Sequence, residues 1–346
     1  MAHEITLTDR MFSVREMPWH YQDTKDRTTI FAEYPGREEA MVAAGHTWEA
    51  VEGQLLVATE PLPDWAESGT GIRLDDWKAI RRNDTYATLG ITRKSYSIIQ
   101  PVVMYEIQEA IHEVASDVPG GVNYETGGSM GGGRIVWTLS RLGEGYKVPG
   151  DDSHTFPYIC VSTSFDGSEP LRADATDVRV VCANTFGFMK SKAVAGAGRA
   201  FVFRHTAKWR DRVEDARLAL AGIREQHEAW VEVLHDLAER PLKKGALTDF
   251  VTALIPAPPK DLATERVMRN VEEARDSIRA LVTNGRTVPG DHRDTAYGLF
   301  LAGTEYLDHV RVSRTGAEGR FNRSILNHDK TKDRVLRLAR ELSHAA

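Results

Sequence analysis

The chain has 346 residues, of which 41% are hydrophobic and 27% charged, a composition that excludes a disordered or collagen-like polymer. The formal net charge of -6 excludes a general attraction to nucleic acid, although a local basic face remains compatible with it. No apolar run approaches the roughly 20 residues that span a bilayer. The N-terminal residues lack the basic-then-apolar pattern of a secretory signal, so we expect a cytoplasmic protein without a membrane partner.

The apolar pattern up to about residue 206 predicts a mixture of helices and strands. Helices are expected at 37–44 and 102–114, and strands at 48–59 and 86–99. The proline and glycine content of 61–71 indicates a loop. Three further strands, which we expect to pair antiparallel, are predicted at 122–126, 134–142 and 155–165. A fourth is predicted at 171–177, and a short strand at 200–205.

The residues after the fourth of these strands have the spacing of one helix face. Its members are Val178, Val181, Cys182, Thr185, Phe186 and Met189. Asp177 precedes this run and is a residue type that caps helices. We therefore expect a helix over 178–189 that packs on the sheet, which gives a β-β-β-α core.

From residue 208 onward the periodicity is helical. Helices are expected at 208–239, 246–255, 261–283, 293–312 and 331–343. The predicted fold class is therefore α+β, an antiparallel β-sheet with packed helices followed by a helical C-terminal region. We divide the chain into an α+β core with an N-terminal extension at 1–206, a helical region at 207–312, and a tether with a terminal helix at 313–346.

The two cysteines, Cys160 and Cys182, each lie in an apolar run. Two cysteines without histidines at zinc-ligand spacing do not make a zinc site, so a disulfide or metal pair is the weaker interpretation. We therefore expect buried free thiols.

A cluster of glycines lies between two predicted strands, at Gly127, Gly128, Gly131, Gly132 and Gly133. Glycine permits positive φ and the close approach of another backbone or a ligand. A nucleotide-binding P-loop needs a helix after its glycines, whereas a strand-like segment follows here. The remaining alternatives are a glycine-rich hairpin or bulge, and a hairpin that also contacts a partner or a nucleic-acid backbone.

Only Asp211 opposes a run of cationic residues further along the chain, at Lys190, Lys192, Arg199, Arg204, Lys208, Arg210 and Arg212. Basic residues on neighbouring elements neutralise phosphates and release counterions. The interleaved aromatic residues Phe201, Phe203 and Trp209 could stack on bases. The alternative is a solvated helix end, with Phe201 and Phe203 filling a core face.

No catalytic residue, metal site or cofactor is assigned from the sequence. No serine lies in a G-x-S-x-G elbow, and no pair of carboxylates stands out as an acid–base dyad. Glu305, Asp308 and His309 share a helical face and could form half of a metal site, but a charged helix surface is the simpler interpretation. The sequence therefore favours a binding surface over an enzyme.

Seven segments occur in the same order as in a known family: MFSVREMPWH, AGHTWEAVEG, YATLGITRKSYSIIQP, GGSMGGGRIVWTL, VRVVCANTF, FVFRHTAKWRDRVEDA and TAYGLFLAGTEYLDH. Over 11–312 the chain resembles the phage/plasmid-like protein family, the domain of unknown function 932. Pro101 departs from the family pattern, which often has asparagine at this place. The resemblance implies a phage, prophage or plasmid gene in a bacterial host and no settled activity.

A second resemblance rests on the three predicted strands and the helix with Thr176, Asp177, Arg179 and Gly187. This arrangement is similar to the β-β-β-α core of single-strand annealing recombinases of the eukaryotic Rad type and their phage relatives. Those proteins form rings and hold single-stranded DNA in a basic groove. The resemblance implies a groove without cofactor, lined by the glycine-rich hairpin, Arg134 and the basic run, and extended by homo-oligomerisation.

We therefore expect a DNA-binding accessory protein of a mobile element, which binds single-stranded DNA through cationic side chains gathered in one channel. The residues expected to contact the nucleic acid are Arg134, Lys190, Lys192, Arg199, Arg204, Lys208 and Arg210. The rival hypothesis is a protein-interaction module that inhibits or modifies a host protein. Its anchors would be exposed tryptophans among Trp19, Trp48, Trp65 and Trp77.

Overall fold

A computed structural model of the chain describes residues 9–15, 28–57, 71–115, 122–179, 184–186, 201–206, 223–285, 287–311 and 330–344. Its strands are β1 (Met11–Val14), β2 (Thr28–Phe31), β3 (Ala50–Val57), β4 (Ile72–Arg82), β5 (Thr88–Arg93), β6 (Asn123–Met130), β7 (Ile135–Arg141), β8 (Tyr146–Lys147), β9 (His154–Ser164), β10 (Leu171–Arg179), β11 (Asn184–Phe186) and β12 (Phe201–Phe203). Its helices are α1 (Arg37–Ala44), α2 (Pro101–Ala115), α4 (Ile223–Glu239), α5 (Ala246–Leu254), α6 (Glu265–Asn284), α7 (Ala296–Glu305) and α9 (Lys330–Glu341).

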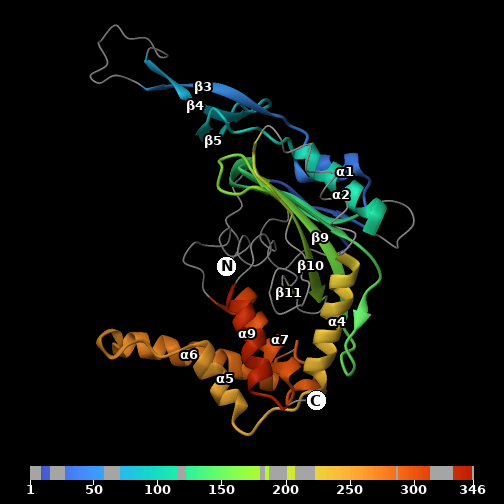
Figure 1. Cartoon of the computed structure of the whole chain (residues 1–346), viewed down its shortest axis with the longest axis vertical. Helices are drawn as coiled ribbons and strands as arrows, with labels where there is room; N and C mark the ends of the chain where they lie inside the picture. The colour runs from blue at the N-terminus through green and yellow to red at the C-terminus, as the bar shows by residue number, and fades with distance from the viewer. Residues whose placement is uncertain are drawn as a thin grey trace.

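The larger sheet forms the centre of the molecule (Figure 1). Its strand order is β11-β10-β9-β7-β6-β1-β2, with β12 beside β10 and β8 beside β9. The described pairs are antiparallel, apart from β1 with β2. The strands predicted at 122–126, 134–142, 155–165, 171–177 and 200–205 are confirmed as β6, β7, β9, β10 and β12, and the α+β fold class is confirmed with them.

The predicted helix over 178–189 is wrong at the positions that the structure describes. β10 continues to Arg179, and β11 follows it at Asn184–Phe186. The two strands pair antiparallel, with Val178 opposite Thr185. The other side of β10 pairs with β9, and these ladders outweigh the helical spacing of a few apolar residues, because valine and threonine suit a pleated surface.

Helices α1 and α2 pack on one face of the larger sheet and confirm the helices predicted at 37–44 and 102–114. Ala40 of α1 and Met104 of α2 share a buried core with Phe12, Val136 and Ile159 of the sheet. Pro101 begins α2, at the one helical position where a missing backbone N–H costs nothing. The departure from the family pattern therefore coincides with a helix start.

A second sheet, with strand order β3-β4-β5, projects beyond the end of the larger sheet (Figure 1). We call it the arm, residues 50–57 and 71–93. Strands β3 and β5 confirm the strands predicted at 48–59 and 86–99, whereas β4 is not among the predicted elements. The loop predicted at 61–71 lies almost entirely outside the described residues.

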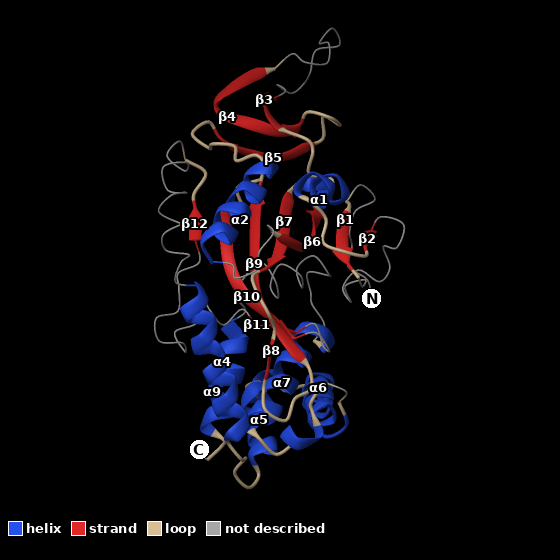
Figure 2. Cartoon of the chain, turned by 90° about the vertical axis from the view of Figure 1, so that its right-hand side faces the viewer, coloured by secondary structure: helices blue, strands red, loops and turns tan. Residues whose placement is uncertain are grey.

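The helices from α4 onward form a separate core at the end of the molecule opposite the arm (Figure 2). Trp230, Phe250, Ile278, Phe300 and Val335 contribute to it from α4, α5, α6, α7 and α9 in turn. The helical C-terminal region is confirmed, and its last helix belongs to the same core as the others. The division of the chain at 206 and 312 stays a prediction.

Two smaller expectations concern thiols and membranes. Cys160 is a buried free thiol, as predicted, and Cys182 lies outside the described residues. Across the residues that the structure describes, no helix combines the length and the apolar character of a membrane span.

Candidate functional site

The first two glycines of the cluster lie inside β6, where they let β1 approach. A Cβ on Gly127 would lie 2.9 Å from Cε1 of Phe12, and a Cβ on Gly128 would lie 2.8 Å from the backbone oxygen of Arg10. Side chains do not fit at such distances, so the pairing of β1 with β6 requires glycine at both positions. Their contact with nucleic acid stays a prediction.

The other three glycines form the turn between β6 and β7, which confirms a glycine-rich hairpin. Gly131, Gly132 and Gly133 have φ angles of 63°, 74° and 99°, values that favour glycine. The amide of Gly132 donates a hydrogen bond of 2.8 Å to Oδ1 of the buried Asp9. A phosphate at this amide would therefore have to displace a carboxylate of the chain itself.

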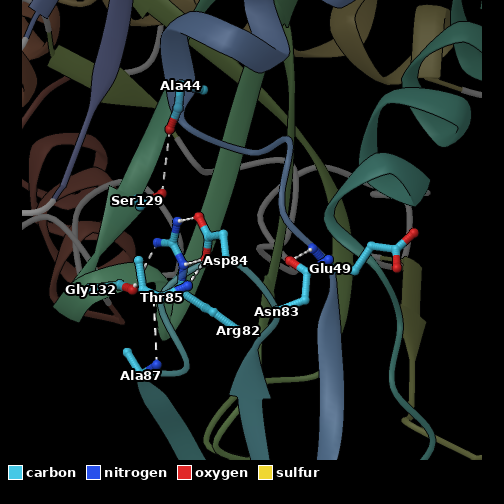
Figure 3. A network of polar contacts seen from close by, with 9 residues as sticks. All are labelled: Ala44, Glu49, Arg82, Asn83, Asp84, Thr85, Ala87, Ser129 and Gly132. Atoms are coloured by element: carbon cyan, nitrogen blue, oxygen red, sulfur yellow. Dashed lines mark hydrogen bonds and ion pairs between the residues drawn. The ribbon is translucent and has the colours of Figure 1, made fainter.

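The glycine turn holds the arm through Arg82 (Figure 3). Nη1 of Arg82 donates to the backbone oxygen of Gly132 at 3.3 Å, and its guanidinium lies 4.7 Å from the ring centre of Trp48. Nε and Nη2 hold both carboxylate oxygens of Asp84 at 2.8 and 2.7 Å, which lowers the pKa of Asp84. A Cβ on Gly133 would lie 3.0 Å from Cζ2 of Trp48, so glycine makes room for this contact.

Two further contacts fasten the base of the arm. The side-chain amide of Gln100 accepts from the backbone N–H of Ala50 at 2.8 Å and donates to the Ala50 oxygen at 3.0 Å. Gly90 of β5 lies so close to the turn between β9 and β10 that a Cβ there would be 2.3 Å from Cα of Asp166. The arm is thus held at several points of its base while its far end projects.

A groove of about 1210 Å³ opens beside this anchor, between α1, the turn between β4 and β5, and the glycine turn. Its charged lining residues are Asp9, Glu38, Glu39, Asp84, Arg10 and Arg82. Carboxylates outnumber guanidinium groups, and Arg82 is already paired with Asp84. The groove therefore does not favour the phosphates of a nucleic acid.

Two of the predicted nucleic-acid contacts lie in the described part of the chain. Nε of Arg134 lies 3.4 Å from Oδ2 of Asp166, and Arg204 is exposed. The strand register places both at the end of the larger sheet that carries the arm. The remaining predicted contacts lie outside the described residues, namely Lys190, Lys192, Arg199, Lys208 and Arg210.

The arm turns one side of its sheet to solvent, which we call the outer face. Residues directly opposite each other in a sheet share a face, and the cross-strand pairs that define this one are Val51 with Arg81, Ala79 with Ile91 and Trp77 with Arg93. Trp77 is 37% exposed and Ile91 is 50% exposed. The guanidinium of Arg93 lies 4.2 Å from the ring centre of Trp77, within cation–π distance.

A second aromatic–guanidinium contact lies at the turn between β4 and β5. Tyr86 is 66% exposed and has a φ of 58°, which is rare for a bulky residue. Cζ of Arg81 lies 5.5 Å from its ring centre, and Nε of Arg81 donates to its backbone oxygen at 3.2 Å. Among the described residues, neither Arg81 nor Arg93 forms an ion pair with a carboxylate.

The charge of the arm differs in sign from that of the whole chain. Residues 50–57 and 71–93 contain five Lys or Arg and four Asp or Glu, a net charge of +1. The inner face, by contrast, is buried at Ile80, Lys78 and Thr92. Residues 77–82 show no regular alternation of apolar and polar residues, since Ala79 and Ile80 are adjacent, so local pattern gave no clear signal for β4.

A buried histidine ties the segment after α1 to the glycine-containing strand β6. Nε2 of His46 lies 3.0 Å from the backbone oxygen of Gly128, which can only accept, so Nε2 carries the proton. Nδ1 then accepts from the hydroxyl of Tyr105 at 2.9 Å. Burial, with the nearby positive charge of Arg82, lowers the pKa of His46 to about 4, so the ring is neutral at pH 7.

The carboxylates of the half metal site considered from the sequence have other partners. Asp308 is buried and holds Nζ of Lys332 at 2.8 Å, and Glu305 accepts a hydrogen bond from Thr287. Within the described ranges, no group of three or more histidine, cysteine, aspartate or glutamate side chains has an arrangement suited to a metal ion.

These features define an α+β protein whose central sheet carries a projecting, cationic sheet at one end and a helical unit at the other. The family described as Domain of unknown function (DUF932) matches residues 88–326, more than half of the chain. The chain belongs to this family, as the resemblance predicted. The match begins in β5, so β3 and β4 precede it. No curated protein and no solved structure matches the chain.

Proposed function

We propose that this protein is a DNA-binding accessory protein of a phage or plasmid, and that the outer face of the arm binds single-stranded DNA. One observation carries the proposal: the outer face has two solvent-facing aromatic–guanidinium contacts, Trp77 with Arg93 and Tyr86 with Arg81. Aromatic rings stack on bases, and guanidinium groups neutralise phosphates.

The exposed sheet surface of the outer face favours a single strand over a duplex. Bases in a duplex are stacked on each other and present only their edges, so a sheet surface reaches base faces only where the strand is unpaired. Ile91, two residues from Arg93 on the same face, extends the apolar surface next to Trp77, and Val51 is exposed further along this face opposite Arg81. Such binding needs no cofactor, and a homo-oligomer would align several arms along one strand.

Binding of a fluorescent oligothymidylate across a salt series tests the proposal. Each stacked base contributes about 1–3 kcal/mol, so Trp77→Ala is expected to weaken binding about 5- to 150-fold. The double variant Arg81→Gln, Arg93→Gln is expected to reduce the slope of log affinity against log salt by about 1.4. Arg269→Ala removes a guanidinium that is 65% exposed on α6 and serves as the matched control, with affinity and slope unchanged.

Tyr86→Gly separates binding from stability. Relief of the positive φ contributes about 1 kcal/mol, which offsets the greater conformational freedom of glycine in the unfolded chain, about 0.5–1 kcal/mol. We expect the free energy of unfolding to change by less than about 1 kcal/mol while binding of single-stranded DNA weakens several-fold. A flat salt response, or full affinity in both aromatic variants, contradicts the proposed function.

The far end of the arm supports a second candidate function. Leu56, Val57 and Ile72 are exposed by 41%, 46% and 61%, and Val57 lies opposite Ile72 in the sheet. Grouped exposed apolar side chains mark protein-interaction sites, so the arm would dock on a host protein that it inhibits or modifies. Capture of one host protein at fixed stoichiometry, abolished by Leu56→Glu with Ile72→Lys, in a protein that does not bind DNA, would favour this alternative.

A further inference from the structure

A tyrosine hydroxyl lies among three charged side chains near the β1–β2 edge of the larger sheet. Tyr34 stands in the loop between β2 and α1, and its Oη donates to Oε2 of Glu125 at 3.2 Å. Nη1 of Arg141 donates to the same Oη at 3.4 Å, and the guanidinium of Arg15 lies 4.9 Å from the centre of the Tyr34 ring. Arg15 is exposed and the other three are partly exposed, so a ligand can reach the group from solvent.

Irregular backbone at two strands brings these side chains together. Glu125 occupies a register shift in β6, between Tyr124 and Thr126. Arg15 directly follows β1 and has a φ of 67°. Bulges re-aim side chains next to active sites, and positive φ at a non-glycine residue persists where the surroundings impose it, often at functional positions. The backbone N–H of Arg15 donates to the Phe31 oxygen at 2.7 Å at the end of the β1–β2 pairing, while its exposed side chain gains no burial from this conformation.

We propose that Tyr34 is the nucleophile of a phosphodiester transesterification on DNA, with Glu125 as its base and the exposed Arg15 as the phosphate-binding group. Arg141 positions the Tyr34 hydroxyl, because its other nitrogens hold Gly143 and Glu144. The inference rests on the proposed function, in which the arm binds the strand. Arg141 lies at the end of β7 away from the arm, so the strand would run from the arm along the larger sheet to Tyr34. A nucleophilic hydroxyl needs an adjacent base and a means to stabilise the charge that develops on the phosphate. The described contacts of Tyr34 provide both.

The step is balanced without an oxidant, a reductant or a second substrate. Oη of Tyr34 attacks phosphorus as Glu125 takes the phenolic proton, and a phosphotyrosyl bond forms. The bond between phosphorus and the deoxyribose oxygen opposite Tyr34 breaks. Water gives this oxygen a proton, and Glu125 returns its own proton to water, so the step balances. The chain is then joined to one DNA end, and the other end is a free hydroxyl. Attack by that hydroxyl reverses the step and reseals the strand.

The surroundings of Glu125 suit this proton transfer. Burial raises the pKa of Glu125, against the opposing effects of the Tyr34 hydrogen bond and of Arg15 and Arg141. A carboxylate with a raised pKa is a stronger base and releases its proton nearer to neutral pH. Tyr158 donates a second hydrogen bond to Oε2 at 3.4 Å and is nearly buried, so it positions the carboxylate.

The experiment incubates the full chain with single-stranded DNA, labelled at one end in one sample and at the other end in a second. Denaturation with detergent then leaves only covalent adducts, which migrate slowly on a gel. We expect an adduct with one of the two labels, and mass spectrometry of the digested protein to find the nucleotide on Tyr34. Tyr34→Phe is expected to abolish the adduct, and Glu125→Gln to slow its formation about a hundredfold or more.

Tyr96→Phe is the matched control, because it removes a tyrosine hydroxyl that donates to the backbone oxygen of Ser164, away from Glu125, and is expected to keep adduct formation. Binding of each variant to the oligonucleotide is measured in parallel. Wild-type binding without any adduct overturns the nucleophile and leaves the proposed function standing, whereas no binding at all overturns both. An adduct that persists in Tyr34→Phe, or a nucleotide found on another residue, also overturns the assignment.

Discussion

Acidification is expected to destabilise the protein through His46. The ring is buried and neutral, with its Nε2 proton donated to Gly128 and its Nδ1 accepting from Tyr105. Protonation would place a charge in the core and remove the acceptor that the Tyr105 hydroxyl uses. The folded state therefore resists protonation at pH values where the unfolded chain already binds a proton.

The magnitude follows from the difference between the two pKa values. The pKa of His46 is about 4 in the folded protein and 6.5 in an unperturbed histidine. At about 1.4 kcal/mol per pH unit, the separation corresponds to ~3 kcal/mol. Because the folded pKa is the lower one, this stability is fully present above pH 6.5, declines as the pH falls, and is lost below about pH 4.

Urea unfolding of the wild type and of His46→Gln, measured at intervals from about pH 7.5 to about pH 4, isolates this contribution. Glutamine retains an N–H donor for Gly128 but does not titrate. His112, whose pKa burial also lowers to about 4, is present in both proteins and cancels in the difference. The variant is expected to be less stable at neutral pH and to lose less stability on acidification. Parallel profiles of the two proteins would refute the assigned protonation state.

Two further predictions test how the parts are joined. Gly90→Ala is expected to cost about 1–3 kcal/mol and to reduce hydrogen-exchange protection of β5, because its Cβ would collide with Asp166, whereas Gly143→Ala, whose Cβ meets nothing within 4 Å, should be neutral. Lys332→Met is expected to cost about 3–5 kcal/mol in urea unfolding by leaving Asp308 buried without its cation, and Asp308→Leu in the same chain should restore most of it. Equal stability of Lys332→Met and the wild type would contradict a closely packed α9.

Elements with a long, regular pattern were predictable from sequence. Helices α1 and α2 and strands β6, β7 and β9 follow from local periodicity, since each has a continuous covered face. The segment after Asp177 was not predictable in this way, because its apolar spacing fits a helix face. Its strand structure comes from pairing with β9, whose residues lie about twenty positions earlier in the chain. The spacing of apolar residues along the chain carries no information on such cross-strand hydrogen bonds, so it cannot decide between a helix and a strand.

The role of the glycine cluster shows a different limit. Its hairpin was readable, because a strand pattern stands on both sides of the glycines. The residues that the turn contacts could not be predicted from local sequence, because Asp9 and Arg82 are separated from Gly132 by 123 and 50 residues. The structure brings these three together, and the carboxylate that caps the turn makes it a support for the arm.

The density of charge along the sequence does not indicate the outer face. The basic run at 190–212 has more cations in sequence, but the arm has two guanidinium groups stacked on exposed rings, a feature that only the pairing of β4 with β5 reveals. Of the tryptophans considered as anchors, Trp48 is buried beneath Arg82 and Trp77 is partly exposed. Trp48, which precedes β3, therefore supports the anchor of the arm, whereas Trp77 lies within the arm on its outer face.

Three strands with one solvated face do not hold together well alone, so the arm depends on its base. Ala50 and Ile80 of its inner face belong to the core of the larger sheet, and Arg82 is fixed between Trp48, Asp84 and the glycine turn. A surface held in this way is already ordered before a ligand arrives, and binding then loses little conformational entropy. The glycine cluster and the outer face therefore depend on each other. The glycines make room for the contacts of Arg82 and Trp48, and these contacts keep the arm folded although its outer face is exposed to solvent.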